Sequence, residues 1–338
     1  QITPVSDTVL YDGEVHQLQG FETTKITVNG KTFTIEGLEA SARGTDADTY
    51  PMVVTGIVKV IDEEGNDVTE QFHIHTVSGE LKISQRKVTL TSGSAQKEYD
   101  GAPLTSTEIA VGGQGFAETE GLSYQVNGMQ KITGSSVNHF TYSANANTDL
   151  SNYDISTQFG ILTVTNRQAQ FEIELQPQSA SFIYDGKPHS VEGFVSTEFT
   201  VNDHVYTLSG LTASVSAVNA GSYPVIVEGE AILLDEEGND VTEQFALNIL
   251  PSTLEISRRN VVLTSGSDEK EYDGIALENR SVEVSGDGFA ENEGAEYLVE
   301  GSRTLTGTSS NIFSYSLNEN TDPDNYDIEQ RYGTLTIL

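Results

Sequence analysis

Residues 26–35 read Ile-Thr-Val-Asn-Gly-Lys-Thr-Phe-Thr-Ile, with apolar and polar residues alternating on both sides of Asn29-Gly30. Alternation with a period of two is typical of a strand that buries one face. Asn-Gly is the pair that best tolerates the positive φ angles of a type I′ turn. The stretch therefore predicts a β-hairpin, and residues 201–206 (Val-Asn-Asp-His-Val-Tyr) encode it a second time.

The rest of the chain has the same character. Phe140–Ser143 and Phe313–Ser316 also alternate, and no dozen residues show the three-and-four apolar spacing of a helix. The 31 glycines would interrupt any longer helix. We expect an all-β fold with short helical turns at most, the best candidates being Asp67–Gln71 and Asp240–Gln244, where Asp or Thr could cap one turn.

The second half of the chain repeats the first without insertion or deletion. Residues 62–72 (DEEGNDVTEQF) recur letter for letter at 235–245, an offset of 173 residues that still holds from Gly160 to Gly333. Such an intact duplication indicates an array, which serves reach, avidity or spacing more often than a single catalytic pocket.

A weaker period divides each half in two. Tyr-Asp-Gly begins at Tyr11, Tyr99, Tyr184 and Tyr272, and each copy is followed by an alternating closing strand. We therefore predict four small β modules in A-B-A-B order, immunoglobulin-like or β-grasp-like: module A (1–84), module B (85–167), module C (168–257, a repeat of A) and module D (258–338, a repeat of B).

The junctions between modules are short and contain no glycine or proline, which favours an elongated rod. From the rise of a strand we expect each module to be about 30 Å long and the four together on the order of 120 Å or more. The junctions also hold five basic residues that we expect to pair with carboxylates of the neighbouring module: Arg86, Lys87, Arg167, Arg258 and Arg259.

Composition restricts the class of protein. With 51 acidic and 17 basic residues the net charge is −34, which excludes nucleic-acid binding because such binding needs Lys and Arg against phosphate. No run of about 18 apolar residues and no basic-then-apolar leader is present, so we expect no membrane insertion and an excised piece of a longer secreted protein. Cysteine is absent, which excludes disulfides and thiolate sites.

Three motifs could be sites, and each has a structural interpretation that we favour. Tyr-Asp-Gly would place a ring in the core, an Asx turn and a glycine with positive φ. His73 and His75 form a His-x-His pair on an expected strand, but their counterparts are Ala246 and Asn248, which argues against zinc. Residues 62–67 resemble a calcium loop but lack its alternating ligands, so we interpret them as a hairpin turn.

A second acidic loop, Asn320–Asn325, loses one carboxylate in its copy at 147–152, which weakens the case for a shared calcium site. No nucleophile elbow, phosphate loop or His-Glu-x-x-His motif occurs. The sequence therefore predicts no enzyme, no catalytic, cofactor-binding or metal-binding residues, and no cofactor.

Several motifs together resemble a known family. Tyr-Asp-Gly-x-x-His at 11–16 and 184–189, Gly-Asn-Asp-Val-Thr at 65–69 and 238–242, and Asn-Tyr-Asp-Ile at 152–155 and 325–328 are similar to the tandem MBG/YDG-type repeats of large wall-anchored surface proteins of Gram-positive bacteria. The resemblance covers essentially the whole chain. It implies a small all-β fold, an extracellular location that is cell-wall anchored or secreted, and a role as a stalk or in mucus adhesion.

We therefore predict a non-enzymatic stalk or spacer segment of an adhesin-like surface protein, a monomeric fragment of something larger. The alternative is a repeat that itself binds host glycan, mucin or extracellular matrix through multivalency. The absence of tryptophan counts mildly against sugar stacking, although 14 tyrosines leave room for it.

Two further expectations concern strands. Phe171, Ile173 and Leu175 alternate into module C, whereas Gln1 is the counterpart of Glu174, so module A should lack part of its first strand. Lys97 and Lys270 precede a Tyr-Asp-Gly tyrosine by two residues and could form an amide with Asn152 or Asn325. We favour a lysine that reaches solvent instead, because burying an unpaired ammonium is costly.

Overall fold

The computed structural model describes residues 1–338 and consists of β-strands joined by turns and four short 3₁₀ segments, with no α-helix. The predicted all-β class is confirmed. No helix long and apolar enough to cross a membrane occurs. The chain divides into two compact units, unit 1 (Gln1–Asn166) and unit 2 (Arg167–Leu338).

In module A the long strand β4 is the centre of a four-stranded antiparallel sheet with β2, β3 and β6, and a second sheet has the order β1-β7-β5, with β1 parallel to β7. The elements are β1 (Asp7–Leu10), β2 (His16–Gln19), β3 (Lys25–Val28), β4 (Lys31–Gly44), β5 (Thr49–Pro51), β6 (Val53–Ile61), η1 (Thr69–Gln71) and β7 (Glu80–Ser84).

Module B contains three small sheets, ordered β10-β8-β14, β11-β13 and β12-β15-β9. Its elements are β8 (Arg86–Ser92), β9 (Ala95–Glu98), β10 (Ile109–Gly113), β11 (Leu122–Val126), β12 (Gly134–Val137), β13 (Phe140–Ala144), η2 (Leu150–Asn152), β14 (Tyr153–Gln158) and β15 (Ile161–Thr165). No sheet joins a strand before Gln85 to one after it.

Unit 2 repeats this plan and adds one strand, because β16 pairs in parallel with β23. Its elements in module C are β16 (Phe171–Leu175), β17 (Ala180–Ile183), β18 (His189–Glu192), β19 (Glu198–Val201), β20 (His204–Ala217), β21 (Gly221–Pro224), β22 (Ile226–Leu234), η3 (Thr242–Gln244), β23 (Phe245–Ile249) and β24 (Thr253–Ser257). Those in module D are β25 (Arg259–Ser265), β26 (Asp268–Lys270), β27 (Val282–Gly286), β28 (Ala295–Val299), β29 (Gly307–Asn311), β30 (Phe313–Leu317), η4 (Pro323–Asn325), β31 (Tyr326–Arg331) and β32 (Gly333–Ile337).

The predicted hairpin is present in both copies. Val28 pairs with Lys31 across Asn29 and Gly30, which have φ of 50° and 80°. In the copy, Asn202 and Asp203 have φ of 50° and 64°. Both turns therefore have the two positive φ angles of a type I′ turn.

The strands β4 and β6 approach closely at a bulge between Glu36 and Leu38. A Cβ on Gly37 would lie 2.2 Å from the carbonyl oxygen of Ile57, so only glycine fits there. Gly210 has the same relation to the carbonyl oxygen of Glu230, at 2.1 Å, which shows that the bulge is duplicated with the sequence.

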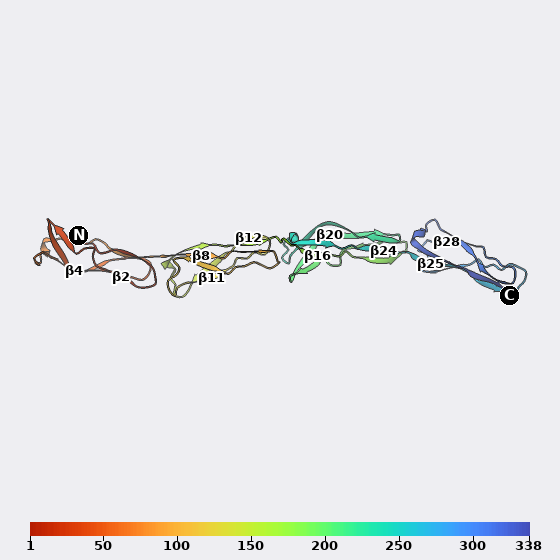
Figure 1. Ribbon diagram of the computed structural model, residues 1–338, viewed down its shortest axis with the longest axis horizontal. Helices are drawn as coiled ribbons and strands as arrows, with labels where there is room; N and C mark the ends of the chain where they lie inside the picture. Colours follow the sequence, from red (N-terminus) through yellow and green to blue (C-terminus); the bar gives the residue numbers. More distant parts are fainter. The chain divides into compact units, whose positions relative to one another are not determined.

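Within each unit the second module continues from the end of the first, and their facing ends share one core (Figure 1). In unit 1, Leu81 and Ile83 of β7 belong to the same buried cluster as Val88 and Leu90 of β8. Because each module has two or more sheets and no helix crosses them, the structure favours the immunoglobulin-like over the β-grasp-like alternative.

One local prediction is wrong. His73 and His75 were expected on a strand, but residues 72–75 form none, whereas their counterparts lie in β23. The physical reason is that a strand needs a partner for its backbone groups, and the strand that pairs with β23 has almost no counterpart in module A.

Candidate functional site: the joint inside each unit

The facing ends of modules A and B are joined by one carboxylate that binds two tyrosines. Tyr11, directly after β1, donates its hydroxyl to Glu120 Oε1 at 2.5 Å, and Tyr153, the first residue of β14, donates to Glu120 Oε2 at 2.8 Å. In unit 2, Tyr184 and Tyr326 bind the two oxygens of Glu293 at 2.6 and 2.7 Å. Hydrogen bonds to a charged acceptor are stronger than neutral ones, so this pairing is a specific link between modules.

The rings of these tyrosines form the core of the joint. Tyr11 and Tyr153 are each 4% exposed, and their ring centroids lie 5.7 Å apart in an edge-to-face arrangement. Burial, reinforced by the bond to the glutamate, raises the pKa of Tyr153 and of Tyr184 to about 12 and moves the pKa of Tyr11 and Tyr326 in the same direction. The phenols are therefore neutral donors over the physiological pH range.

An arginine at the junction binds main-chain carbonyls on both sides. Arg86 Nη1 donates to the carbonyl oxygen of Tyr11 at 3.1 Å in module A, and Nε donates to that of Gly115 at 2.9 Å in module B. Arg259 makes the equivalent bonds to Tyr184 and Gly288, at 3.0 and 2.8 Å. We expected carboxylate partners, and this was wrong because a planar guanidinium can satisfy several carbonyls that the joint would otherwise bury.

Two other basic junction residues make contacts of a different kind. Arg167 places its guanidinium 4.0 Å from the ring centroid of Phe171 at the start of module C, a cation–π contact. Arg258 pairs with Asp327 of its own module at 3.4 Å, where both side chains are largely exposed.

An asparagine also links the two modules of each unit. Asn152 Oδ1 accepts from the backbone N–H of Ala47 at 2.6 Å, and its Nδ2 donates to Asp46 at 3.1 Å. Asn325 repeats the first bond with Ala220 at 2.7 Å. The Asn-Tyr-Asp-Ile motif of modules B and D therefore lies at the joint, where its tyrosine packs against the tyrosine of the Tyr-Asp-Gly motif of modules A and C.

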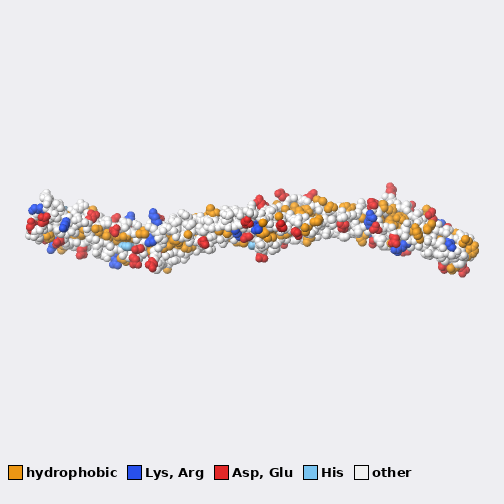
Figure 2. Space-filling view, viewed as in Figure 1, with side chains coloured by type: hydrophobic (Ala, Val, Ile, Leu, Met, Phe, Trp, Pro, Cys, Tyr) orange, Lys and Arg blue, Asp and Glu red, His pale blue; other side chains and the backbone are white.

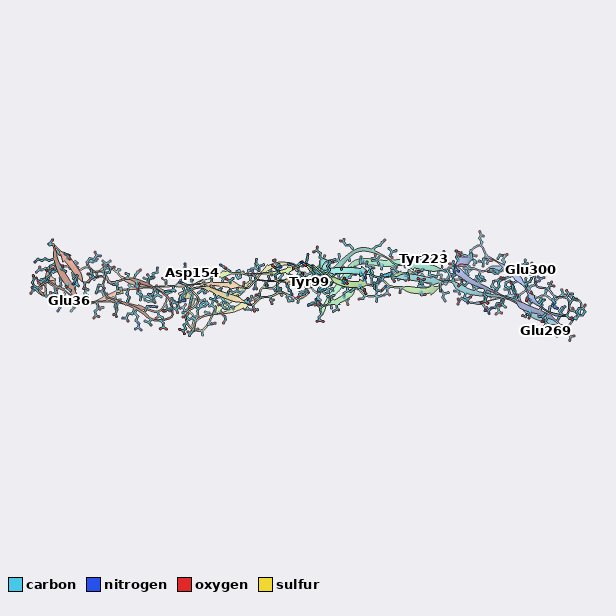
Figure 3. All side chains as sticks on the ribbon, viewed as in Figure 1. Glu36, Tyr99, Asp154, Tyr223, Glu269 and Glu300 are labelled. Carbon is cyan, nitrogen blue, oxygen red and sulfur yellow. The ribbon has the colours of Figure 1, made fainter.

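A further tyrosine shapes the loop that each asparagine binds. Tyr50 donates to the carbonyl oxygen of Asp46 at 3.0 Å, and Tyr223 donates to that of Asn219 at 2.9 Å. Tyr223 and Asp154, which follows Tyr153 in β14, are labelled near the joints of their units in Figure 3.

The Tyr-Asp-Gly-x-x-His motif is a self-contained turn. Asp12 accepts from the backbone N–H of Glu14 at 2.9 Å, which is the main reason that its pKa is lowered, and it contacts His16 Nε2 at 2.9 Å. Gly13 has φ of 85°, as the turn requires. The predicted structural role of the motif is confirmed for Tyr11, Tyr99 and Tyr184.

Tyr272 differs from the other three tyrosines because the residue is 56% exposed. The neighbouring apolar residues Ile275 and Leu338 are 67% and 64% exposed, so no core forms over the ring. The turn itself survives, with Asp273 accepting from the N–H of Ile275 at 2.9 Å.

The acidic loops satisfy their carboxylates with their own backbone. Asp62 accepts from the N–H groups of Glu64 and Asn66, and the bonds to Asn66 lower its pKa. Ile61 pairs with Asp67 across the loop, as in a hairpin turn. Asp67 accepts from Thr69, although the N-cap residue of η1 is Val68 and makes no side-chain cap.

In the second pair of loops, Asp149 and Asp322 each cap a 3₁₀ turn through the N–H group two residues later. These turns, η2 and η4, were not foreseen from the sequence. No group of three or more His, Asp or Glu side chains is placed to hold a metal ion.

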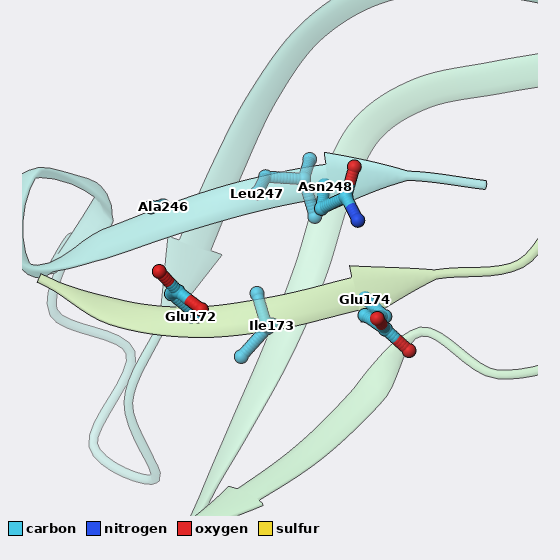
Figure 4. Close-up of a pocket in the computed structure, with 6 residues that line it drawn as sticks. All are labelled: Glu172, Ile173, Glu174, Ala246, Leu247 and Asn248. Atoms are coloured by element: carbon cyan, nitrogen blue, oxygen red, sulfur yellow. The ribbon is translucent and has the colours of Figure 1, made fainter.

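A cavity of about 640 Å³ lies along the β16–β23 pair of module C and is lined by three residues of each strand (Figure 4). Glu172 and Glu174 face it from β16 and Asn248 from β23. None of these lining groups is a nucleophile beside a base. We therefore interpret the cavity as a groove on the surface of the strand pair. Acidic side chains are spread along the visible face of both units without gathering there (Figure 2).

The structure gives the proposed crosslink residues different partners. Lys97 Nζ donates to Asp100 at 2.6 Å and to the carbonyl oxygen of Ala102 at 2.7 Å. Asn152 lies at the other end of module B, beside the start of β8. An intact mass lower by one ammonia for each B-type module would reveal the amide, and the unmodified mass is expected.

No protein-family model matches the chain, and no curated protein shows a significant match. Among solved structures it is similar to Drosophila N-cadherin EC1-4, with 9% identity, 99% of both chains covered and a TM-score of 0.19. The Bacillus anthracis TIE protein matches with 10% identity over 97% of this chain and 61% of that one, with a TM-score of 0.18. An endo-fucoidan hydrolase of glycoside hydrolase family 107 matches with 10% identity over 75% and 43%, with a TM-score of 0.20.

Proposed function

We propose that the chain is a non-enzymatic stalk or spacer segment of a bacterial cell-surface, adhesin-like protein related to the MBG/YDG-type repeats, located outside the cell and either wall-anchored or secreted. The observation that carries the proposal is the joint. Tyr-Asp-Gly and Asn-Tyr-Asp-Ile, two of the three motifs that carry the family resemblance, contribute to this link between modules, and the tyrosine–glutamate contacts recur in both units.

A spacer must resist bending at its junctions. Bending unit 1 at its joint would separate Tyr11 from Glu120, break the bond of Arg86 to the carbonyl oxygen of Tyr11 and expose the shared core. A buried group that loses its hydrogen-bond partner costs about 1–3 kcal/mol, and a buried aromatic ring contributes more. A small module without disulfides also gains stability from this shared core.

Small-angle scattering tests the proposal on the full chain. We expect a maximum dimension on the order of 120 Å, from the rise of strands placed end to end. Glu120→Ala with Glu293→Ala should broaden the distance distribution by loosening both joints. The matched control is Glu118→Ala, an exposed glutamate of the same loop as Glu120, which should leave the profile unchanged. A compact profile for the parent chain would contradict a spacer.

Direct ligand binding by the repeat is a second candidate, favoured by one observation. Tyr124 lies opposite Tyr142 on β11 and β13, Tyr142 is 38% exposed, and the pair recurs as Tyr297 and Tyr315. An exposed ring offers a face for stacking. Binding on a glycan array that is lost in Tyr142→Ala with Tyr315→Ala would support this role, and a clean negative result would leave the spacer.

A further inference from the structure

The loop that carries the joint glutamate is nearly identical in the two units. Residues 115–121 read Gly-Phe-Ala-Glu-Thr-Glu-Gly and residues 288–294 read Gly-Phe-Ala-Glu-Asn-Glu-Gly, so the loops differ only at Thr119 and its counterpart Asn292. These two residues have φ angles of 66° and 64°, and both are exposed. The two joints therefore place different side chains on the same backbone conformation.

The loop holds the hydroxyl group of a tyrosine of its own module. Tyr153 accepts from the N–H of Ala117 at 3.0 Å and donates to Glu120. Tyr326 accepts in the same way from the N–H of Ala290, also at 3.0 Å. The conformation of the loop therefore sets the position of the carboxylate that reaches the other module.

A positive φ angle is costly for only one of the two differing residues. The left-handed backbone brings Cβ close to the following carbonyl oxygen, and a β-branched residue such as Thr119 is an outlier there. Asparagine is enriched in this conformation, which suits Asn292. Asn147 donates its amide to the carbonyl oxygen of Thr119, and Asn320 donates to that of Asn292. The same bond thus holds both loops, but in unit 1 it holds a strained residue.

A charge difference across the joint acts in the same direction. In unit 2, Lys187 Nζ of module C lies 3.9 Å from Glu291 Oε2 of module D, and both side chains are exposed. Their counterparts in unit 1 are Glu14 and Glu118, which line one cavity of about 490 Å³. A repulsion between like charges there replaces the attraction of unit 2. Because exposed charges interact weakly, this repulsion adds less than the strain at Thr119.

We propose that the two joints open unequally, and that unit 1 bends at its joint more readily than unit 2. Opening of the joint in unit 1 releases the strain at Thr119 and separates Glu14 from Glu118. Opening of the joint in unit 2 releases no such strain and breaks the pair made by Lys187. The inference rests on the proposed spacer role, in which each joint resists bending, and it makes unit 1 the more compliant of the two.

Amide hydrogen exchange measures the opening of each joint in the full chain. The N–H groups of Ala117 and Ala290 are matched probes, because each residue follows a phenylalanine and each N–H is bonded to a tyrosine hydroxyl. Under conditions where exchange follows the opening equilibrium, Ala117 should exchange about three- to tenfold faster than Ala290. Equal rates, or faster exchange of Ala290, would contradict the inference.

Substitution of unit 1 with the residues of unit 2 assigns the cause. Thr119→Asn with Glu14→Lys should slow the exchange of Ala117 to about the rate of Ala290. Thr119→Gly should also slow it, because glycine adopts positive φ without strain and has no side chain that could form a new bond. The control is Thr141→Asn, an exposed threonine of β13, which should leave the exchange of Ala117 unchanged.

The reverse substitutions separate this cause from every other difference between the units. Asn292→Thr with Lys187→Glu should speed the exchange of Ala290 by about three- to tenfold. If neither set of substitutions changes the exchange at its own joint, the inference is wrong. The spacer role itself fails by a different result, a compact scattering profile of the parent chain.

Discussion

Modules A and C have identical sequences at residues 62–72 and 235–245, but the chain forms different structures after these segments. Phe245 begins the strand β23, while Phe72 begins no strand. The difference lies in a partner that comes from elsewhere in the sequence, since β16 precedes β23 by about 70 residues. The local sequence favours an extended backbone in both modules. It forms a strand only in module C, where β16 provides a hydrogen-bonding partner.

The joints show the opposite behaviour. Glu120 and Glu293 have the same two tyrosine partners, and Arg86 and Arg259 the same carbonyls. The glutamate, the two tyrosines and the arginine are present in both units, so the duplication reproduces these contacts. Whether a repeat reproduces a structure therefore depends on whether all of its partners are repeated with it.

The largest effect is expected when the extra strand of module C, β16, is removed, because this tests whether β23 depends on it. Ile173 is 5% exposed, so Ile173→Asp should lower the free energy of unfolding of unit 2 by about 3–5 kcal/mol through lost burial and a buried charge. Hydrogen exchange of residues 245–249 should rise to the level of residues 72–76. Unchanged protection would show that β23 does not depend on β16.

Alkaline pH should weaken both joints together. Tyr153 and Tyr184 have pKa values of about 12 in the folded chain against 10.0 for the free side chain, so their contribution is complete below pH 10 and is lost as the pH rises toward 12. Each such shift corresponds to about 2–3 kcal/mol. Absorbance of tyrosinate should place Tyr11, Tyr153, Tyr184 and Tyr326 among the late-titrating residues, and Glu120→Gln should lower the pKa of only the two in unit 1.

Removing the carboxylate of a joint should cost the same in either unit. Glu120→Ala and Glu293→Ala each leave two tyrosine hydroxyls without their acceptor, which predicts a loss of about 1–2 kcal/mol in thermal or denaturant unfolding. Glu118→Ala is the control. A large difference between the two units would mean that the joints are less alike than their contacts indicate.

The smallest effect concerns the two hairpin turns. Asp203 has φ of 64°, which glycine adopts more easily, so Asp203→Gly should stabilise module C by about 0.5–1 kcal/mol. Gly30→Asp should destabilise module A by a similar amount. Chemical denaturation measures both, and changes of the same sign would contradict a shared turn type.

Much of the fold could be predicted from local signals. Alternation and Asn29-Gly30 predicted the hairpin, the residues of Tyr-Asp-Gly predicted a turn, and the offset of 173 predicted equivalent strands. Less could be predicted of the joint. Nothing in the spacing indicates that Glu120 would bind Tyr11, because the two residues are 109 positions apart and the chain has 51 acidic residues to choose from.

The sequence by itself determined the β class, the duplication and the turns, since these depend on side-chain periodicity and on φ preferences that act within a few residues. Only the tertiary structure decided which carboxylate, arginine and asparagine join the modules of a unit, and that residues 72–75 stay unpaired. Those outcomes depend on groups distant in the chain, because a buried hydrogen-bonding group is satisfied by whatever partner the fold brings to it.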